Sequence, residues 1–323
     1  MTFQRRTILQ QAAVAAATLA LGSPGQAQSA AAVRRPSAYG PIGLELEGSF
    51  AGWLDSVQGG DWAVDVITDP PGQTVGVLKK HVANFGVTDI VLSVGNWMSS
   101  AFYQWLQETL ARGTPRRSGA ILTFDNLLRP IGRLEFGYAL LKEVGFPALD
   151  AASRDTAHFT VRIAPEQARR VVATAAAPGL SGKGRSPWLV SNFRVAVDAV
   201  DTSSVSAIDA LTVAQNLATD TRGNVIVEAV IEPDLAITQP GAGTFGPWVD
   251  DFLVQGNRLD ANEKAGTLTM LAPNLKDTLF TLSFSHLGVA GYGPSGAVQP
   301  GAPLATRTQL YMEDMQFDFT PTW

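Results

Sequence analysis

The sequence predicts a mainly β protein (α+β in the broad sense) made of two tandem β-barrel or sandwich modules, each with one outer helix. First, most apolar residues alternate with polar ones in short runs, which is typical of half-buried strands. Second, one order of elements occurs twice, over residues 44–167 and 193–319. Third, a Gly-X-Trp triplet follows a β-branched run in each half, at Gly95-Asn96-Trp97 and Gly246-Pro247-Trp248.

Each half opens with segments that the alternation predicts to be hairpins. A further β-branched run precedes each Gly-X-Trp triplet, at residues 88–94 and 224–230. A long irregular excursion, residues 68–86, precedes the first of these runs and is rich in Pro and Gly. The opening segments are residues 44–48, 52–57 and 62–66 in the first half, and residues 193–198, 203–208 and 211–215 in the second.

One helix is expected after each triplet. In the first half Ser99 or Ser100 caps it, and Gly113 and Pro115 end it. Apolar residues at helical spacing define one face of this helix, namely Phe102, Trp105, Leu106, Thr109 and Leu110. In the second half the corresponding residues are Trp248, Phe252 and Leu253, over a shorter helix that ends at Gly256.

The remainder of each half is expected to be strand. A charged turn leads into a strand after each helix, at residues 116–124 and 263–271. Two closing strands follow in each half: residues 134–141 pair with 158–164, and residues 278–287 with 309–319.

Length and composition fit two domains. A chain of 323 residues exceeds a usual single domain. We expect modules at residues 38–170 and 189–323, joined by a linker at residues 171–188 that is rich in Ala, Gly and Ser. The net charge of −5 gives no nucleic-acid footprint. The arginine pairs at residues 116–117 and 169–170 are interpreted as solvated turns rather than phosphate sites.

Residues 1–32 are expected to be an export signal followed by a flexible arm. Twin arginines, Arg5 and Arg6, precede a weakly hydrophobic Ala-rich stretch, which resembles a twin-arginine export signal. Cleavage is expected near residues 27–32, and the mature chain has no predicted membrane span. The alternative is a disordered N-terminal arm that is never cleaved. The chain has no cysteine, which fits export without disulfides and excludes thiol catalysis.

The sequence predicts no catalytic, cofactor-binding or metal-binding residues, and therefore no enzyme. His81, His158 and His286 are far apart and have no metal-ligand spacing. Nucleophile-elbow, dinucleotide and phosphate-loop motifs are absent, and the Gly-Lys-Gly at residues 182–184 lacks a preceding strand. Adjacent acids, at residues 250–251 and 313–314, diverge on a strand or helix and are interpreted as solvated surface groups.

The tryptophans leave a second interpretation open. They can line a sugar-binding face, although those within alternating runs and helices more often anchor cores. This gives an alternative function, a secreted monomeric β-sandwich protein that binds carbohydrate or another surface ligand. A periplasmic hydrolase is a further alternative with no motif behind it. The tryptophans in question are Trp53, Trp62, Trp97, Trp105, Trp188 and Trp248.

The first half resembles the tail-tube proteins of contractile phage tails, which share their fold with the tube protein of type VI secretion. The resemblance covers most of residues 40–170 and rests on residues 79–90, on the tryptophan-bearing helix from Trp97 to Gly113, and on residues 116–122. Its most telling part is Leu149-Asp150-Ala151 before a terminal strand that ends near Glu166. The second half keeps the order of elements without these motifs.

This resemblance implies a non-enzymatic structural protein that self-assembles into rings or tubes. Family members join their sheets into a ring with a β-barrel inner wall, and the excursion at residues 68–86 resembles their long hairpin loop. Two modules per chain make a cyclic trimer with six modules the economical assembly. Expected partners are the chain itself, stacked rings, and baseplate- or sheath-like proteins. An exported chain is periplasmic or extracellular; without the signal it is cytoplasmic or virion-associated.

Overall fold

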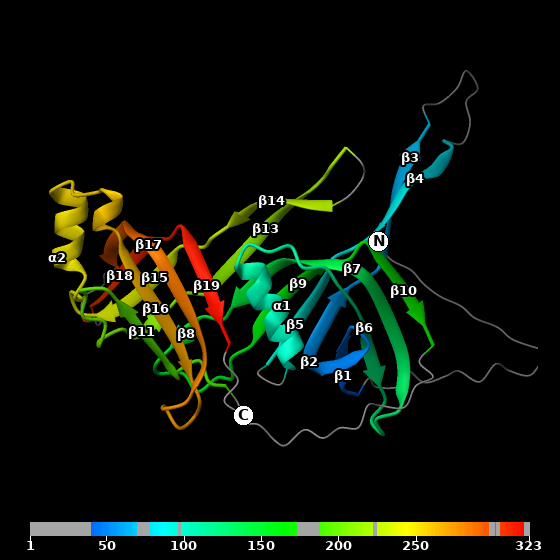
Figure 1. Cartoon of the computed structure of the whole chain (residues 1–323), viewed down its shortest axis with the longest axis horizontal. Coiled ribbons are helices and arrows are strands. Elements are labelled where there is room, and N and C mark those ends of the chain that lie inside the picture. The colour runs from blue at the N-terminus through cyan, green and yellow to red at the C-terminus, as the bar shows by residue number, and fades with distance from the viewer. Residues whose placement is uncertain are drawn as a thin grey trace, which may run out of the picture. The chain divides into compact units, whose positions relative to one another are not determined.

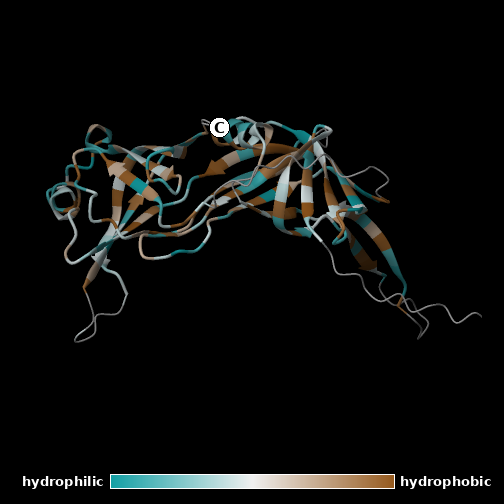
Figure 2. Ribbon diagram, turned by 90° about the horizontal axis from the view of Figure 1, so that it is seen from below, coloured by the Kyte–Doolittle hydropathy of each residue, from teal (hydrophilic) through white to brown (hydrophobic). Residues whose placement is uncertain are grey.

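The structure is a computed structural model that describes residues 40–69, 78–95, 98–172, 188–221, 225–296, 301 and 304–319. The prediction of a mainly β protein with few helices is confirmed: two large sheets account for most strands (Figure 1). Apolar and polar residues alternate along many of these strands (Figure 2). The export signal, Trp97, the Gly-Lys-Gly at 182–184 and most of the expected linker lie outside the described residues.

The described residues of the first half, within residues 40–172, form ten strands and one helix. Its elements in chain order are β1 (Ile42–Leu46), β2 (Ser49–Gly59), β3 (Trp62–Thr68), β4 (Lys80–Val87), β5 (Ile90–Val94), α1 (Ser100–Leu110), β6 (Arg117–Phe124), β7 (Pro130–Phe146), β8 (Leu149–Asp150), β9 (Phe159–Ala164) and β10 (Gln167–Val171).

A closed barrel forms the centre of the first half. Antiparallel pairing runs β7-β6-β1-β2-β5-β9, and a further pairing between β9 and β7 closes the circle. Closure leaves these six strands without an open edge in the barrel wall. β10 continues the line of β9 along β7, so both lie on the same side of that long strand. β3 and β4 pair only with each other and extend away from the barrel (Figure 1).

The second half, residues 188–319, builds a second sheet. Its elements are β11 (Phe193–Val197), β12 (Ala207–Ile208), β13 (Leu211–Thr219), β14 (Val225–Ile231), β15 (Leu235–Pro240), α2 (Gly246–Val249), the π-helical turn η1 (Asp250–Val254), the 3-10 turn η2 (Asp260–Asn262), β16 (Lys264–Leu271), β17 (Thr278–Pro294), β18 (Ala305–Tyr311) and β19 (Asp314–Asp318). The sheet runs β11-β16-β17-β18-β15-β12-β8 with β19 on β17, and so includes β8 from the first half.

The two long strands, β7 and β17, have the same local irregularities. Each has 17 residues, and its ninth residue is a non-glycine in the left-handed region, Tyr138 with φ 51° and His286 with φ 54°. Each also carries a bulge at Lys142 or Ala290, where the pairing register shifts. Positive φ is costly for such side chains, so both strands are bent at a defined place.

Strand pairing follows the same scheme in both halves at most positions. β6 pairs β7 and β1, as β16 pairs β17 and β11. β5 pairs β2 and β9, as β15 pairs β12 and β18. β3 pairs β4, as β13 pairs β14. The pairing of β1 with β2 has no counterpart among the described residues, because β12 pairs β8 instead.

The hairpin predicted at the start of the second half is wrong. Its three segments became β11, β12 and β13, which pair with β16, with β15 and β8, and with β14 and β7 respectively. The alternation located the strands but carries no information on their partners. In the first half, the excursion expected at residues 68–86 includes a strand, β4. The predicted closing pairs, β7 with β9 and β17 with β18 and β19, are confirmed.

Both predicted helices are present. In α1, Ser99 is the N-cap residue, and the predicted apolar face, with Tyr103 added, is buried. The second helix is short: α2 and η1 bury Trp248 and Phe252 before Gly256, which has φ 81°. Most core side chains of the two sheets belong to one continuous apolar cluster.

Candidate assembly surface

The three histidines do not converge on one place. Each one lies near a different carboxylate. His81 Nδ1 lies 3.7 Å from Asp69, His158 Nδ1 lies 2.7 Å from Asp55, and His286 Nδ1 lies 2.9 Å from Glu263. Over the described ranges, no group of three or more His, Cys, Asp or Glu side chains is arranged to hold a metal ion.

The adjacent acids face different neighbours. Asp250 and Asp251 belong to η1, and Asp251 accepts a hydrogen bond of 2.6 Å from Asn257. Asp314 begins β19 and is paired with Arg112 at 3.1 Å, whereas the Glu313 side chain is 63% exposed. Glycoside chemistry needs two carboxylates facing one cleft, and neither pair has that arrangement.

Three of the tryptophans considered for a sugar-binding face are buried, namely Trp105, Trp188 and Trp248. Trp53 packs edge-on against Phe50 and Phe124. Only Trp62, among those that the structure describes, is largely exposed, with 58% of its surface accessible. A sugar-binding row of exposed tryptophans is therefore not formed by the described residues.

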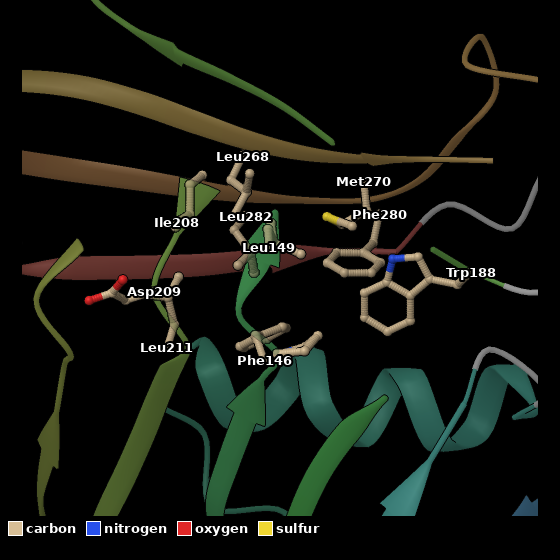
Figure 3. Close-up of a pocket in the computed structure, with 11 residues that line it drawn as sticks. Phe146, Leu149, Trp188, Ile208, Asp209, Leu211, Leu268, Met270, Phe280 and Leu282 are labelled. Atoms are coloured by element: carbon tan, nitrogen blue, oxygen red, sulfur yellow. The ribbon is translucent and has the colours of Figure 1, made fainter. Parts of the chain in front are cut away.

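An apolar cluster fills the space between the two sheets (Figure 3). Phe146 and Leu149 from the first half meet Leu268, Phe280 and Leu282 from the second. The cavity that they leave measures about 10 Å³. That is about the space of one water, so this region holds the halves together and offers no room for a substrate.

The most unusual surface belongs to the two-stranded sheet of β3 and β4, which we call arm 1. Every residue of β3 is exposed, and so is every residue of β4 except the partly exposed Val87. Cross-strand pairs place apolar side chains together on one face: Trp62 opposite Val87, Val64 opposite Phe85, and Val66 opposite Val82. The other face carries the polar pair Asp65 and Asn84, together with the pairs Ala63–Gly86 and Ile67–His81. Arm 1 is thus amphipathic, with its apolar face in solvent.

A hollow borders the base of arm 1. Its volume is about 610 Å³, and Trp62 and Phe85 line it from the arm. The opposite wall comes from β7 and β10, including Glu135 and Arg169. Arg169 donates a hydrogen bond of 2.6 Å to Glu135, and Arg170 donates one of 2.6 Å to Asp61 at the foot of the arm. The hollow thus has aromatic side chains on one wall and charged side chains on the other.

The corresponding hairpin of the second half, β13 and β14, which we call arm 2, has a partner. β13 pairs with the last residues of β7, with Leu211 opposite Phe146 and Ala214 opposite Glu143. Arg116 donates hydrogen bonds to the backbone carbonyls of Val225 and Tyr138 and to the Glu166 carboxylate. Arm 2 therefore extends the sheet of the first half and is held by a cation from it.

α1 packs beside β19 at the base of arm 2 (Figure 1). The Tyr103 ring stacks on Phe319 with centroids 3.7 Å apart, and Gln107 donates a hydrogen bond of 3.4 Å to Asp318. Arg112 donates to Asp314 at 3.1 Å and to the carbonyl of Glu313 at 2.7 Å. This set of contacts joins the halves through charge as well as through ring packing.

Glu232 is the one strongly perturbed carboxyl in this contact. Its side chain is 7% exposed, and its nearest cation is Arg112, at 3.9 Å. Burial raises the pKa of Glu232 to about 7; Arg112 opposes that rise and Asp314 adds to it. Removing a carboxylate from water disfavours its charged form, so Glu232 stays protonated well above the usual range.

Sequence reasoning missed the contact between the halves and the isolation of arm 1. Residues 62–66 are predicted to be a strand, but their alternation of apolar and polar residues does not indicate that this strand lies outside the barrel. A bulge between Asp65 and Val66 also breaks the alternation on β4, since Val82 rather than Ala83 lies opposite Val66. This hid β4 within the expected loop.

Comparison with known proteins gives partial likenesses. No family model and no curated protein sequence matches the chain. Among solved structures, a sheath–tube complex of the extracellular contractile injection system PVC is 18% identical, covers 46% of this chain and 99% of its own, and has a TM-score of 0.38. The cap that terminates the tube of the anti-feeding prophage is 19% identical over 46% and 100%, with a TM-score of 0.40. The baseplate of that prophage is 14% identical over 44% and 97%, with a TM-score of 0.36.

Within the described residues, no helix has the length and apolar character needed to cross a membrane.

Proposed function

We propose that this chain is a non-enzymatic structural subunit that associates with copies of itself into closed rings or tubes. The apolar face of arm 1 carries this proposal. A two-stranded sheet on its own is marginal in water, because it buries too little apolar surface to offset the ordering of its backbone. Trp62 and Phe85, 58% and 71% exposed, lie on that face. A surface of this kind favours a protein partner.

We also propose that residues 38–170 and 189–323 are two modules of one duplicated unit. The shared scheme of strand pairing supports this, as do the left-handed residues Tyr138 and His286 at the same place in β7 and β17. The bulges at Lys142 and Ala290 add a third agreement. Chance resemblance between two β-sandwich halves would not reproduce irregularities position by position.

A cyclic trimer is the assembly that this proposal favours. Three chains with two modules each provide six modules, and a closed ring leaves no subunit with an unpaired edge. The partners proposed are the chain itself, stacked rings, and baseplate- or sheath-like proteins. If residues 1–32 act as an export signal, the assembly is periplasmic or extracellular; otherwise it is cytoplasmic or virion-associated. The injection-system structures described above belong to a tube, a cap and a baseplate; the support for the present proposal comes from arm 1.

The test is the mass of the full chain in solution, by size exclusion with light scattering, followed by negative-stain imaging. We expect multimers with closed symmetry. The variant Val66→Asp/Phe85→Asp puts charge on the apolar face of arm 1 and should shift the protein to the monomer. A matched control is Leu127→Asp, which changes an equally exposed leucine in the turn before β7 and should leave the multimer intact. A wild-type chain that stays monomeric at every concentration would reject the proposal and favour the monomeric binding protein.

A further inference from the structure

We infer that arm 1 of one copy pairs with the open edge of β17 in a second copy, in the way that arm 2 pairs with β7 of its own chain. The inference rests on the proposed self-association and names the two surfaces that meet. The contact between arm 2 and the first half serves as its template, and we call it the internal junction. Several features of that junction have a counterpart on the surface of arm 1 or of the second half.

The open edge lies at the end of β17. Along the edge of β7 that faces away from β9, β6 pairs with β7 up to Ala139, and β13 pairs with it from Glu143 to Phe146. On β17, the side opposite β18 carries β16 as far as Leu287. In the described part of the chain, no strand pairs with Gly291–Pro294 on that side. Exposed backbone donors and acceptors of this kind are the usual docking place for an added strand.

The internal junction sets the register of the pairing between copies. The strand register shifts after Asn216 in arm 2 and after Asp65 in arm 1. When the two arms are superposed on these shifts, Ala214 corresponds to Ala63. The bends and bulges of β7 and β17 align Glu143 with Gly291. Because Ala214 lies opposite Glu143, Ala63 of one copy should lie opposite Gly291 of the next.

One step along the strands, the same register brings two exposed aromatic residues together. Val213 lies opposite Val144 in the internal junction, so Trp62 should lie opposite Tyr292 between copies. These side chains are 58% and 40% exposed in the single chain. A cross-strand aromatic pair stabilises antiparallel strands, and burial of both rings adds to that.

The hollow at the base of arm 1 fits the second element of the internal junction. There, α1 packs against β19 beside arm 2, with Tyr103 stacked on Phe319. The counterparts of α1 and β19 are the short helix of α2 and η1, and β10. The hollow of about 610 Å³ lies between arm 1 and β10, where this arrangement places the helix of the second copy.

In both junctions the first half supplies positive charges and the second half supplies negative charges. In the internal junction the first half supplies Arg112 and Arg116, and the second half supplies Glu232 and Asp314. Between copies, the first half offers Arg169 and Arg170 on β10, which are 73% and 59% exposed although they contact Glu135 and Asp61 of their own half. The second half offers Asp250 and Asp251 on η1.

The tip of arm 1 continues this pattern. Arg116, the residue before β6, donates to Val225, the first residue of β14. The equivalent residues are Glu263, before β16, and Lys80, the first residue of β4. Lys80 is exposed. The Glu263 side chain is only 6% exposed and already contacts Tyr311 and His286, whereas Glu313, 4.0 Å from His286, is 63% exposed. Lys80 should therefore lie near Glu313, whereas a first half docked on another first half would bring Lys80 to Arg116. Like charges would penalise that pairing, so first and second halves should alternate around the assembly.

Engineered cysteines test the register in the full chain, which has none of its own. Ala63→Cys and Gly291→Cys are made as separate variants and mixed under mild oxidation. The Cβ built on Gly291 comes no nearer than 3.6 Å to its neighbours, so the substitution fits. We expect a disulfide-linked dimer from the mixture and none from either variant alone. The matched control is Val64→Cys with Gly291→Cys, because adjacent strand residues point to opposite faces.

Charge reversal tests the polarity independently. Adding Asp250→Arg/Asp251→Arg to the Gly291→Cys chain should lower the yield of cross-linked dimer roughly tenfold, since like charges across an interface suppress pairing. Adding Arg169→Glu/Arg170→Glu to the Ala63→Cys chain should then restore it. The thermal unfolding of each variant confirms that it folds. Failure of the second change to restore the yield would overturn the charge assignment.

The outcomes separate this inference from the proposed function. A chain that forms multimers by light scattering but gives no cross-link between residues 63 and 291 overturns the inference and leaves self-association standing. Cross-linking of the control pair at a similar yield also overturns the register. A chain that stays monomeric throughout rejects both.

Discussion

Arm 1 and arm 2 are similar hairpins with different surroundings. Each is an antiparallel pair with one bulge on its returning strand. On arm 2, Leu211, Val213 and Gln215 are buried, because β13 lies along β7. On arm 1 every residue of β3 is exposed. The hairpin sequence alone therefore does not determine whether its apolar residues are buried. That depends on whether the hairpin has another part of the chain beside it, as arm 2 has β7 and arm 1 does not.

The largest expected effect comes from charge at one matched position on the two arms. Val213 is 3% exposed, and the bulges align it with Trp62. Val213→Asp buries a carboxylate without a partner and should cost roughly 3–5 kcal/mol of unfolding free energy. Trp62→Asp should cost less than about 1 kcal/mol in the monomer, because that position is already in water. Urea unfolding at low protein concentration measures both.

Equal losses from these two variants would contradict the comparison. They would mean that arm 1 packs on its own chain in solution, which would also remove the reason to expect a second copy there. A large loss for Val213→Asp alone supports the view that the internal junction is part of the folding unit.

The sequence predicts the elements better than their partners. Residues 134–141 and 158–164 were predicted as a closing pair and form β7 and β9, because strands close in sequence tend to be neighbours. The segments around β12 and β13 were placed in one hairpin, whereas they pair with β15, β8 and β7. Alternation fixes which face of a strand is buried and leaves open which strand lies beside it.

The candidate assembly surface was predictable only in part. Trp62, Val64 and Val66 alternate as any half-buried strand does, and nothing local says that their apolar face is uncovered. The position of Glu232 is the clearer case. It follows β14 in a sequence that reads as a polar turn, yet its side chain is only 7% exposed, with Arg112 of the other half 3.9 Å away. Long-range packing of this kind leaves no local signal.

The second prediction concerns pH and the contact between α1 and β19. The pKa of Glu232 is raised from 4.5 to about 7 by burial, so the folded state holds a proton that the unfolded state releases. Stability from this group is complete below about pH 4.5 and falls as the pH rises to about 7. Glu232→Gln keeps the shape without the charge, and should be about 1–3 kcal/mol more stable than the wild type at pH 8 and equal to it at pH 4.5.

Urea unfolding from pH 4.5 to pH 8 checks this sign. Asp234→Asn is a suitable control, because this nearby acid is exposed and pairs with Gln309 at 2.5 Å. Its variant should follow the wild-type pH profile. A Glu232→Gln profile parallel to the wild type would show that the carboxyl is solvated, and that α1 and β19 make a looser contact than the structure describes.

A third, smaller effect is expected from the cation that holds arm 2. Arg116 donates to the carbonyls of Val225 and Tyr138 and to Glu166. Arg116→Ala removes these charge-assisted hydrogen bonds and should cost about 1–2 kcal/mol. Hydrogen exchange should rise in β13 and β14 before it rises in the barrel. Unchanged exchange in arm 2 would mean that its pairing with β7 suffices to hold it.

The smallest effect belongs to the cation at the foot of arm 1. Arg170 donates a hydrogen bond of 2.6 Å to Asp61, but their side chains are 59% and 67% exposed. An ion pair in such contact with water contributes little, so Arg170→Ala should change the unfolding free energy of the monomer by less than about 0.5 kcal/mol. The foot of the arm is fixed instead by uncharged hydrogen bonds: the Asp61 N–H donates to the Thr88 hydroxyl at 3.0 Å, and the Thr88 N–H donates to the Asp61 carbonyl at 2.9 Å. Calorimetry at low and high salt measures the change in unfolding free energy. A loss as large as that of Arg116→Ala would mean that arm 1 depends on a charged anchor as arm 2 does. The two arms would then differ only in that β13 of arm 2 pairs with β7, whereas arm 1 pairs with no other described strand of its chain.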